Sequence, residues 1–188
     1  MCRQMSQICE LWRTSPAELR TNFGGWREPL PCPRTIRRPN PFTGTLTETE
    51  SWDPTPDIPV KDESEVDLPF EKIDALIGDD GLEVLCTAIS RANGGPPVRL
   101  RPALIGPDDG PWIYAVPSEV TRVLAGLDRF EVAAEFWLAE EEGDLAPKAR
   151  TKTTRPEQIR ELAEQLREFS SFARAAVEAR QEVYLCIW

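Results

Sequence analysis

Thiols are the side chains of this sequence most able to act as nucleophiles or metal ligands. The cysteines stand at positions 2, 9, 32, 86 and 186, with no Cys-x-x-Cys pair among them. Structural zinc sites use closely spaced Cys and His ligands, so we expect no metal site. Cys86 and Cys186 lie in apolar runs, which is typical of buried thiols. Cys32 lies in a Pro-Cys-Pro sequence near Arg34, which makes it the one candidate for an activated thiolate, although an unreactive loop thiol is the simpler interpretation.

The chain contains no histidine. Ser–His and Cys–His nucleophiles are therefore excluded, and so are His metal ligands. An enzyme with this composition would have to use carboxylates, lysine, tyrosine or cysteine. No glycine-rich loop of the Walker or dinucleotide-binding type occurs, so ATP and NAD are not indicated. The sequence assigns no catalytic residue and no cofactor.

Charged side chains gather in a few short segments. Two Asp-Asp-Gly triplets, at 79–81 and 108–110, could suggest paired carboxylates, but turns favour the same residues and the spacing is not that of a calcium loop. Basic residues gather at 34–38 and 148–155, where they could contact phosphates. Solvated loops that balance nearby acids are the simpler interpretation of both basic segments.

The whole chain is acidic, with a formal net charge of −10 from 32 acidic and 22 basic residues. This balance disfavours binding to nucleic acid or to an anionic membrane, because phosphate contact needs a basic surface. It is compatible with a basic protein partner. No stretch approaches the length of about 18 apolar residues typical of a membrane helix, and the first residues lack the apolar region of a signal peptide. We expect a cytoplasmic protein.

The elements that must position these side chains are clearest at the N-terminus. Residues 8–13 predict a short strand. Ser15, Pro16 and Glu18 then have the spacing of a capping box with proline in the first turn, which predicts a helix. Gly24 and Gly25 mark its end.

Residues 27–69 hold half of the 18 prolines. Proline lacks a backbone N–H, so long elements are not expected here, apart from an exposed strand in "TLTETESW". We interpret this region as a long loop or arm packed on a single domain that spans residues 1–188. Its aromatic and acidic side chains are the candidates for contact with a partner: Phe42, Trp52, Asp57, Asp62, Glu63 and Glu65.

The remaining sequence alternates helical and strand patterns. Ile73, Leu76 and Ile77 predict one short helix, and apolar residues from 82 to 89 predict a second. A strand is expected at 112–116, and helices are expected at 118–127, 129–141 and 156–180. The last strand, at 183–188, carries apolar residues on both faces, which is typical of an interior strand. Together these elements predict an α+β fold in which several helices cover a small mixed sheet.

A family resemblance extends from about residue 73 to residue 188. The stretch "WIYAVPSEVTRVLAGLDRFEVAAEF" and the ending "FARAAVEARQEVYLCIW", a long helix followed by an apolar strand, resemble the YfbM-like family of small bacterial proteins. The resemblance implies an α+β fold. It implies no activity and carries over no catalytic residues, because the biochemical role of that family is uncharacterised.

These observations leave three functions open. The first is a non-enzymatic protein, such as an immunity or antitoxin-like protein, that caps a basic partner. The second is a small His-free enzyme that uses carboxylates or Cys32. The third is a homodimeric structural protein that pairs through a sheet edge. A concave pocket that combines Asp or Glu with Arg, Tyr or Cys32 would favour the second, whereas acids spread over a flat face would favour the first.

Overall fold

The computed structural model describes residues 8–39, 44–56, 58–60, 68–75, 79–92, 95–107, 111–144 and 155–188. Its elements follow one another in the order β1 (Cys9–Thr14), α1 (Pro16–Asn22), β2 (Arg34–Pro39), β3 (Leu46–Ser51), β4 (Glu71–Asp74), α2 (Asp79–Ala92), β5 (Arg101–Leu104), β6 (Trp112–Ala115), α3 (Ser118–Ala125), α4 (Phe130–Asp144), α5 (Arg155–Ala179) and β7 (Glu182–Ile187). In this part of the chain, no helix combines the length and apolar character needed to cross a membrane.

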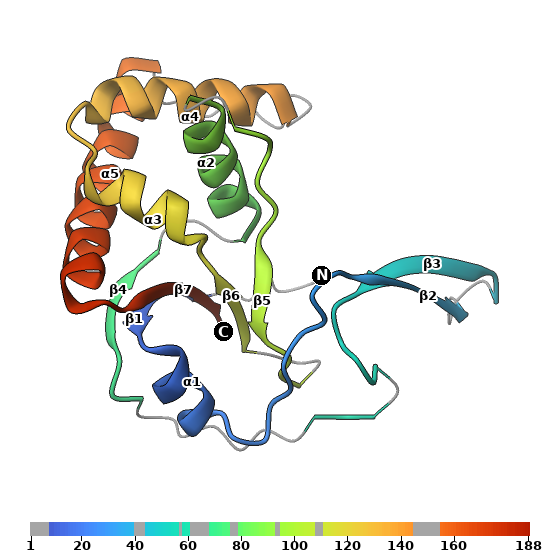
Figure 1. Cartoon of the computed structure of the whole chain (residues 1–188). Helices are drawn as coiled ribbons and strands as arrows, with labels where there is room; N and C mark the ends of the chain where they lie inside the picture. Colours follow the sequence, from blue (N-terminus) through green and yellow to red (C-terminus); the bar gives the residue numbers. More distant parts are fainter. Residues whose placement is uncertain are drawn as a thin grey trace.

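Five strands form the main sheet, in the order β4-β1-β7-β6-β5, and β2 pairs with β3 in a separate hairpin. This confirms the α+β fold class, with β7 as the central strand (Figure 1). We expected a mixed sheet, but every strand pair described is antiparallel. For β6 and β7, the reason is the path of the chain between them. The three helices α3, α4 and α5 leave and return at the same end of the sheet, where the N–H of Val116 donates to the carbonyl of Val183 at 3.0 Å.

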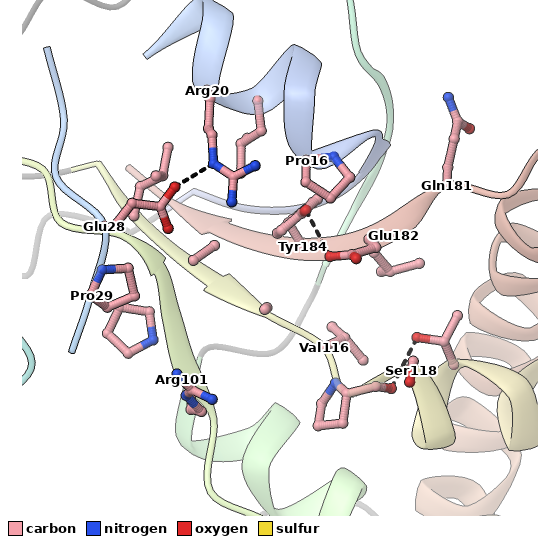
Figure 2. A pocket seen from close by; sticks show the side chains of 18 of the residues that line it. Pro16, Arg20, Glu28, Pro29, Arg101, Val116, Ser118, Gln181, Glu182 and Tyr184 are labelled. Carbon is pink, nitrogen blue, oxygen red and sulfur yellow. Dashed lines mark hydrogen bonds and ion pairs between the residues drawn. The ribbon is translucent and has the colours of Figure 1, made fainter. Parts of the chain in front are cut away.

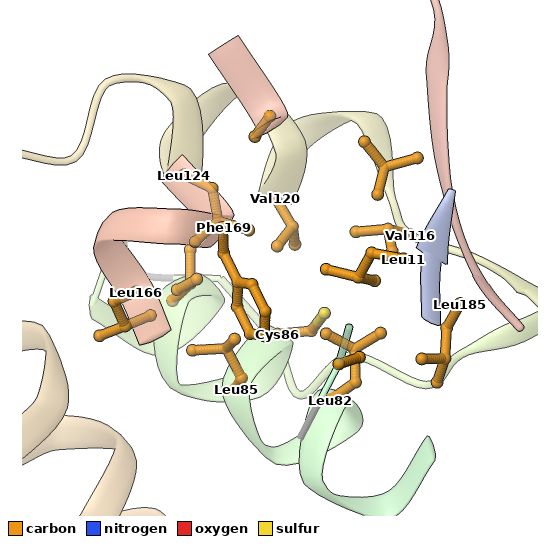
Figure 3. Close-up of a cluster of buried hydrophobic side chains, with 14 of the residues drawn as sticks. Leu11, Leu82, Leu85, Cys86, Val116, Val120, Leu124, Leu166, Phe169 and Leu185 are labelled. Atoms are coloured by element: carbon orange, nitrogen blue, oxygen red, sulfur yellow. The ribbon is translucent and has the colours of Figure 1, made fainter. Parts of the chain in front are cut away.

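The central strand contributes to two separate cores, one on each face of the sheet. Val183, Leu185 and Ile187 pack with α2, α3, α4 and α5 in the larger core, part of which is drawn in Figure 3. Tyr184 and Cys186 point the other way and pack with α1 in the smaller core. Alternate side chains of a strand point to opposite faces, so a strand that is apolar throughout must be covered on both. The prediction of an interior strand is confirmed.

Most of the predicted helices and strands lie within a few residues of their expected bounds, but one is wrong. Ile73 was expected in a short helix, and it lies instead in β4, opposite Leu11 of β1. Pairing along the edge of the sheet outweighed the local helical spacing, as tertiary contacts often do for short segments. The triplet at 79–81, expected in a loop, begins α2. The triplet at 108–110 lies outside the described residues.

The β2–β3 hairpin extends away from the main sheet (Figure 1). It confirms the exposed strand expected in "TLTETESW". The basic segment at 34–38, expected in a solvated loop, lies instead in β2, where Arg37 pairs across the hairpin with the acid Glu48 at 2.7 Å. The segment that follows β3 is held by Arg27. The backbone of Arg27 pairs with Ile105, and its guanidinium contacts Asp53 at 3.2 Å. The hairpin is therefore tied to the segment that follows β5.

Candidate functional site

A pocket of about 650 Å³ lies at the end of the sheet where β6 finishes and β7 begins. Its walls come from α1, β5, the first turn of α3, the start of β7 and the segment around Glu28 (Figure 2). This volume is within the range of about 300–1,000 Å³ typical of small-molecule sites. The pocket therefore has the size of a ligand site.

The floor of the pocket is apolar and comes from the sheet and the elements that flank it. It is formed by buried side chains that also belong to the two cores: Leu19, Leu104, Val116, Val183 and Tyr184. Because these side chains are fixed by core packing, the floor is preformed. It offers dispersion contacts to the apolar part of a ligand.

The rim of the pocket is charged and rich in arginine. Four arginines line it, Arg20, Arg99, Arg101 and Arg122, together with two glutamates, Glu28 and Glu182. In a chain with a net charge of −10 this is a local reversal of sign. Guanidinium groups present several N–H donors in a planar fork, which suits carboxylates and phosphates.

Arg101 differs from the other three arginines. Its guanidinium lies over the ring of Trp52, 5.4 Å from the ring centroid. Within the described residues no carboxylate is paired with it. A guanidinium stacked on an aromatic face keeps its N–H groups available at its edge. Trp52 therefore orients the positive charge of a residue that lines the pocket.

The other three arginines each have a carboxylate partner. Arg99 donates to Glu50 of β3 at 2.7 Å. Arg20 is bonded to Glu28 on the pocket rim, and this partner raises the pKa of Arg20.

Arg122 lies 3.7 Å from Glu119, one turn away on α3. Exposed pairs of this kind are weak and exchange readily with solvent. Much of the positive charge on the rim is thus balanced within the protein.

The first turn of α3 adds partial positive charge to the same wall. Its N-cap is Pro117, which provides no side-chain hydrogen bond to the first turn. The free N–H groups at the start of a helix favour a nearby anion. Ser118, the first residue of the helix, also lines the pocket.

Glu182 and Tyr184 lie on the wall formed by β7. The hydroxyl of Tyr184 donates to Oε2 of Glu182 at 2.9 Å. Burial, together with this carboxylate, raises the pKa of Tyr184 well above its ordinary value. The phenol therefore stays protonated at neutral pH, so it serves as a hydrogen-bond donor and not as a base.

None of the four described cysteines, Cys9, Cys32, Cys86 and Cys186, lines this pocket. Burial raises the pKa of the Cys86 thiol to about 12, with Glu83 adding to the shift, and burial raises the pKa of Cys186 as well. Neither is a thiolate at neutral pH. Cys32 is exposed, as expected. Over the described residues, no group of three or more His, Cys, Asp or Glu side chains is arranged to hold a metal.

Of the candidate contact residues, the structure describes Trp52. It is half-buried, and it holds Arg101 and lines a second pocket of about 350 Å³. Phe42, Asp57, Asp62, Glu63 and Glu65 lie outside the described residues. Sequence reasoning missed Arg101 and Glu182. The alternation in "VRLRP" was the available signal, because it places Arg99 and Arg101 on one face of an extended segment.

Comparisons of the chain with models of protein families, with curated proteins and with solved structures found no match. The resemblance to the YfbM-like family therefore stays a prediction.

Proposed function

We propose that the protein binds a small organic anion in the arginine-rimmed pocket, with Arg101 as the group that contacts the anion. The observation that carries this proposal is the guanidinium of Arg101, which is oriented by Trp52 and has no carboxylate partner among the described residues. Arg101 also lines the pocket, whose volume of about 650 Å³ suits a small ligand. The first turn of α3 adds further attraction for a negative group.

The composition of the pocket favours binding over proton transfer. Arginine does not release its proton in proteins, and the Tyr184 phenol is held in its protonated form. The pocket does combine Glu, Arg and Tyr, which is the arrangement that we expected to favour a His-free enzyme over a flat contact surface. The chemistry of these residues supports recognition of a ligand.

Isothermal titration calorimetry with a panel of anions tests this function. The panel is hexanoate, 6-aminohexanoate, benzoate and phenyl phosphate. We expect saturable binding of at least one, and a loss of about tenfold or more in affinity for Arg101→Gln, because a charge-assisted hydrogen bond contributes about 1.5–3 kcal/mol. Arg160→Gln, an exposed change on α5, is the matched control and should bind like the wild type. Binding that is unaffected by Arg101→Gln would contradict the proposal.

A second candidate function is the recognition of a basic protein, as an immunity or antitoxin-like protein would do. It is supported by Val132 and Phe136, which are 46% and 57% exposed one turn apart on α4, with the exposed Glu135 beside them. Exposed apolar groups next to acids suit a cationic surface with an apolar centre.

Co-purification of the tagged protein from its host tests this second candidate. We expect a stoichiometric basic partner that is lost with Phe136→Ser and kept with Leu46→Ser, an equally apolar and exposed site on the hairpin. Recovery of no such partner across several conditions would count against it. Pairing of two copies through the edge strands β4 or β5 is a further proposal, and light scattering would detect such a dimer.

A further inference from the structure

Two opposite walls of the pocket keep one unbalanced charge each after the internal ion pairs are discounted. On the wall formed by β5 and α3, Arg99 is paired with Glu50 and Arg122 with Glu119. Arg101 has an aromatic ring as its neighbour instead of a carboxylate. One positive charge therefore remains on this side.

The wall formed by α1 and β7 has the reverse balance. Arg20 is bonded to Glu28, so these two charges cancel. Glu182 accepts the hydroxyl of Tyr184 on Oε2, and within the described residues no basic side chain forms an ion pair with it. Its other oxygen, Oε1, is left to accept a further donor. One negative charge remains on this side.

The pocket that carries these two charges also has apolar lining residues. Leu19, Leu104 and Val183 are buried and line the same pocket. Figure 2 shows Arg101 and Glu182 at different sides of it, on β5 and β7. A ligand that covers this floor removes water from both charges, and each desolvated charge is costly unless it gains a partner of opposite sign.

We propose that the ligand of this pocket is a zwitterion with its charges at opposite ends. Its carboxylate pairs with Arg101, its ammonium group pairs with Glu182, and its apolar middle covers the floor. ω-Amino acids and short peptides share this chemistry. This inference rests on the proposed anion-binding function and adds the chemical group at the other end of the ligand, which is an ammonium group.

Calorimetry with matched ligands separates the two ends. The compounds 6-aminohexanoate, hexanoate and hexylamine share one chain and differ in their charged groups. We expect 6-aminohexanoate to bind about tenfold or more tightly than either of the others. Glu182→Gln should remove that advantage without weakening hexanoate, because it removes a negative charge that repels the carboxylate, whereas Arg101→Gln should weaken both acids. The side-chain amide that Glu182→Gln introduces keeps an oxygen that can accept the Tyr184 hydroxyl, so the local fold is preserved.

The outcomes separate the inference from the function on which it rests. If hexanoate binds as tightly as 6-aminohexanoate and Glu182→Gln weakens both equally, the proposal of a zwitterionic ligand is wrong. The proposal that the pocket binds an anion is then still supported. If none of the compounds binds, or if binding is unaffected by Arg101→Gln, both the zwitterionic ligand and the anion-binding function are wrong. Alanyl-alanine and its N-acetyl form distinguish the source of the ligand. Tighter binding of the free dipeptide than of 6-aminohexanoate supports a peptide, and the reverse order supports an ω-amino acid.

Discussion

Glu10 is the one acidic residue of the described chain that the fold buries, and it joins β1 to the end of β7. Its Oε2 accepts the indole N–H groups of Trp12 at 3.0 Å and Trp188 at 3.2 Å, and its Oε1 lies 2.8 Å from the ammonium of Lys72. Burial alone would raise the pKa of Glu10, but the hydrogen bonds from these three groups outweigh it, so the pKa is lowered. The folded protein therefore holds Glu10 as a carboxylate.

Glu10→Gln should destabilise the protein at neutral pH, because the amide keeps an acceptor for the indoles but places N–H₂ against Lys72. We expect a loss of about 1–3 kcal/mol in the free energy of unfolding, measured with urea at pH 7. A lowered carboxyl pKa gives stability that is present above the unfolded pKa of about 4.3 and is lost as the pH falls through the folded pKa. The gap between variant and wild type should therefore shrink in acid. Glu178→Gln, at an exposed position on α5, is the control, and an equal effect of both changes at pH 7 would contradict this role for Glu10.

Elements defined by local chemistry could be predicted from the sequence. The start of α1 is one, because the Ser15 hydroxyl accepts the Glu18 N–H at 3.2 Å and the Glu18 carboxylate accepts the Ser15 N–H at 3.0 Å. Such a cap needs only residues three apart. The edge strand β4 could not be predicted, because its pairing with β1 joins residues far apart in the chain. The spacing of apolar residues around Ile73 does not indicate that β1 is the partner strand.

Removal of the α1 cap should be measurable at the level of the whole protein. Ser15→Ala leaves N–H groups of the first turn without an acceptor, and we expect it to lower the free energy of unfolding by about 1 kcal/mol. The same substitution at Ser171, an exposed position inside α5, should leave stability unchanged or raise it slightly, because alanine is the better helix former. Urea unfolding of both variants checks this. Equal effects at the two positions would show that the cap contributes nothing.

At the scale of the whole molecule, the pocket depends on the way the chain returns. Arg20, Arg101 and Glu182 belong to α1, β5 and β7, and they meet because α5 brings the chain back to the end of the sheet that β6 has just left. No motif relates the three residues in sequence. The sequence predicted the last strand, at 183–188, but neither Glu182 nor the neighbours of that strand, since strand order depends on non-local pairing. The charge balance of the rim could not be predicted from the sequence for the same reason.

The same central strand should determine whether the protein folds at all. Residues 183–188 lie between β1 and β6, and their side chains enter both cores. A chain that lacks these residues leaves β1 and β6 each without one of its two partner strands and both faces of the sheet without their central side chains, so we expect it to be insoluble. Deletion of Trp188 alone is the matched control. It removes a side chain that is 40% exposed, and the variant should stay soluble with a modest loss of stability. Recovery of the six-residue truncation as a soluble protein with a cooperative unfolding transition would overturn the central role of β7.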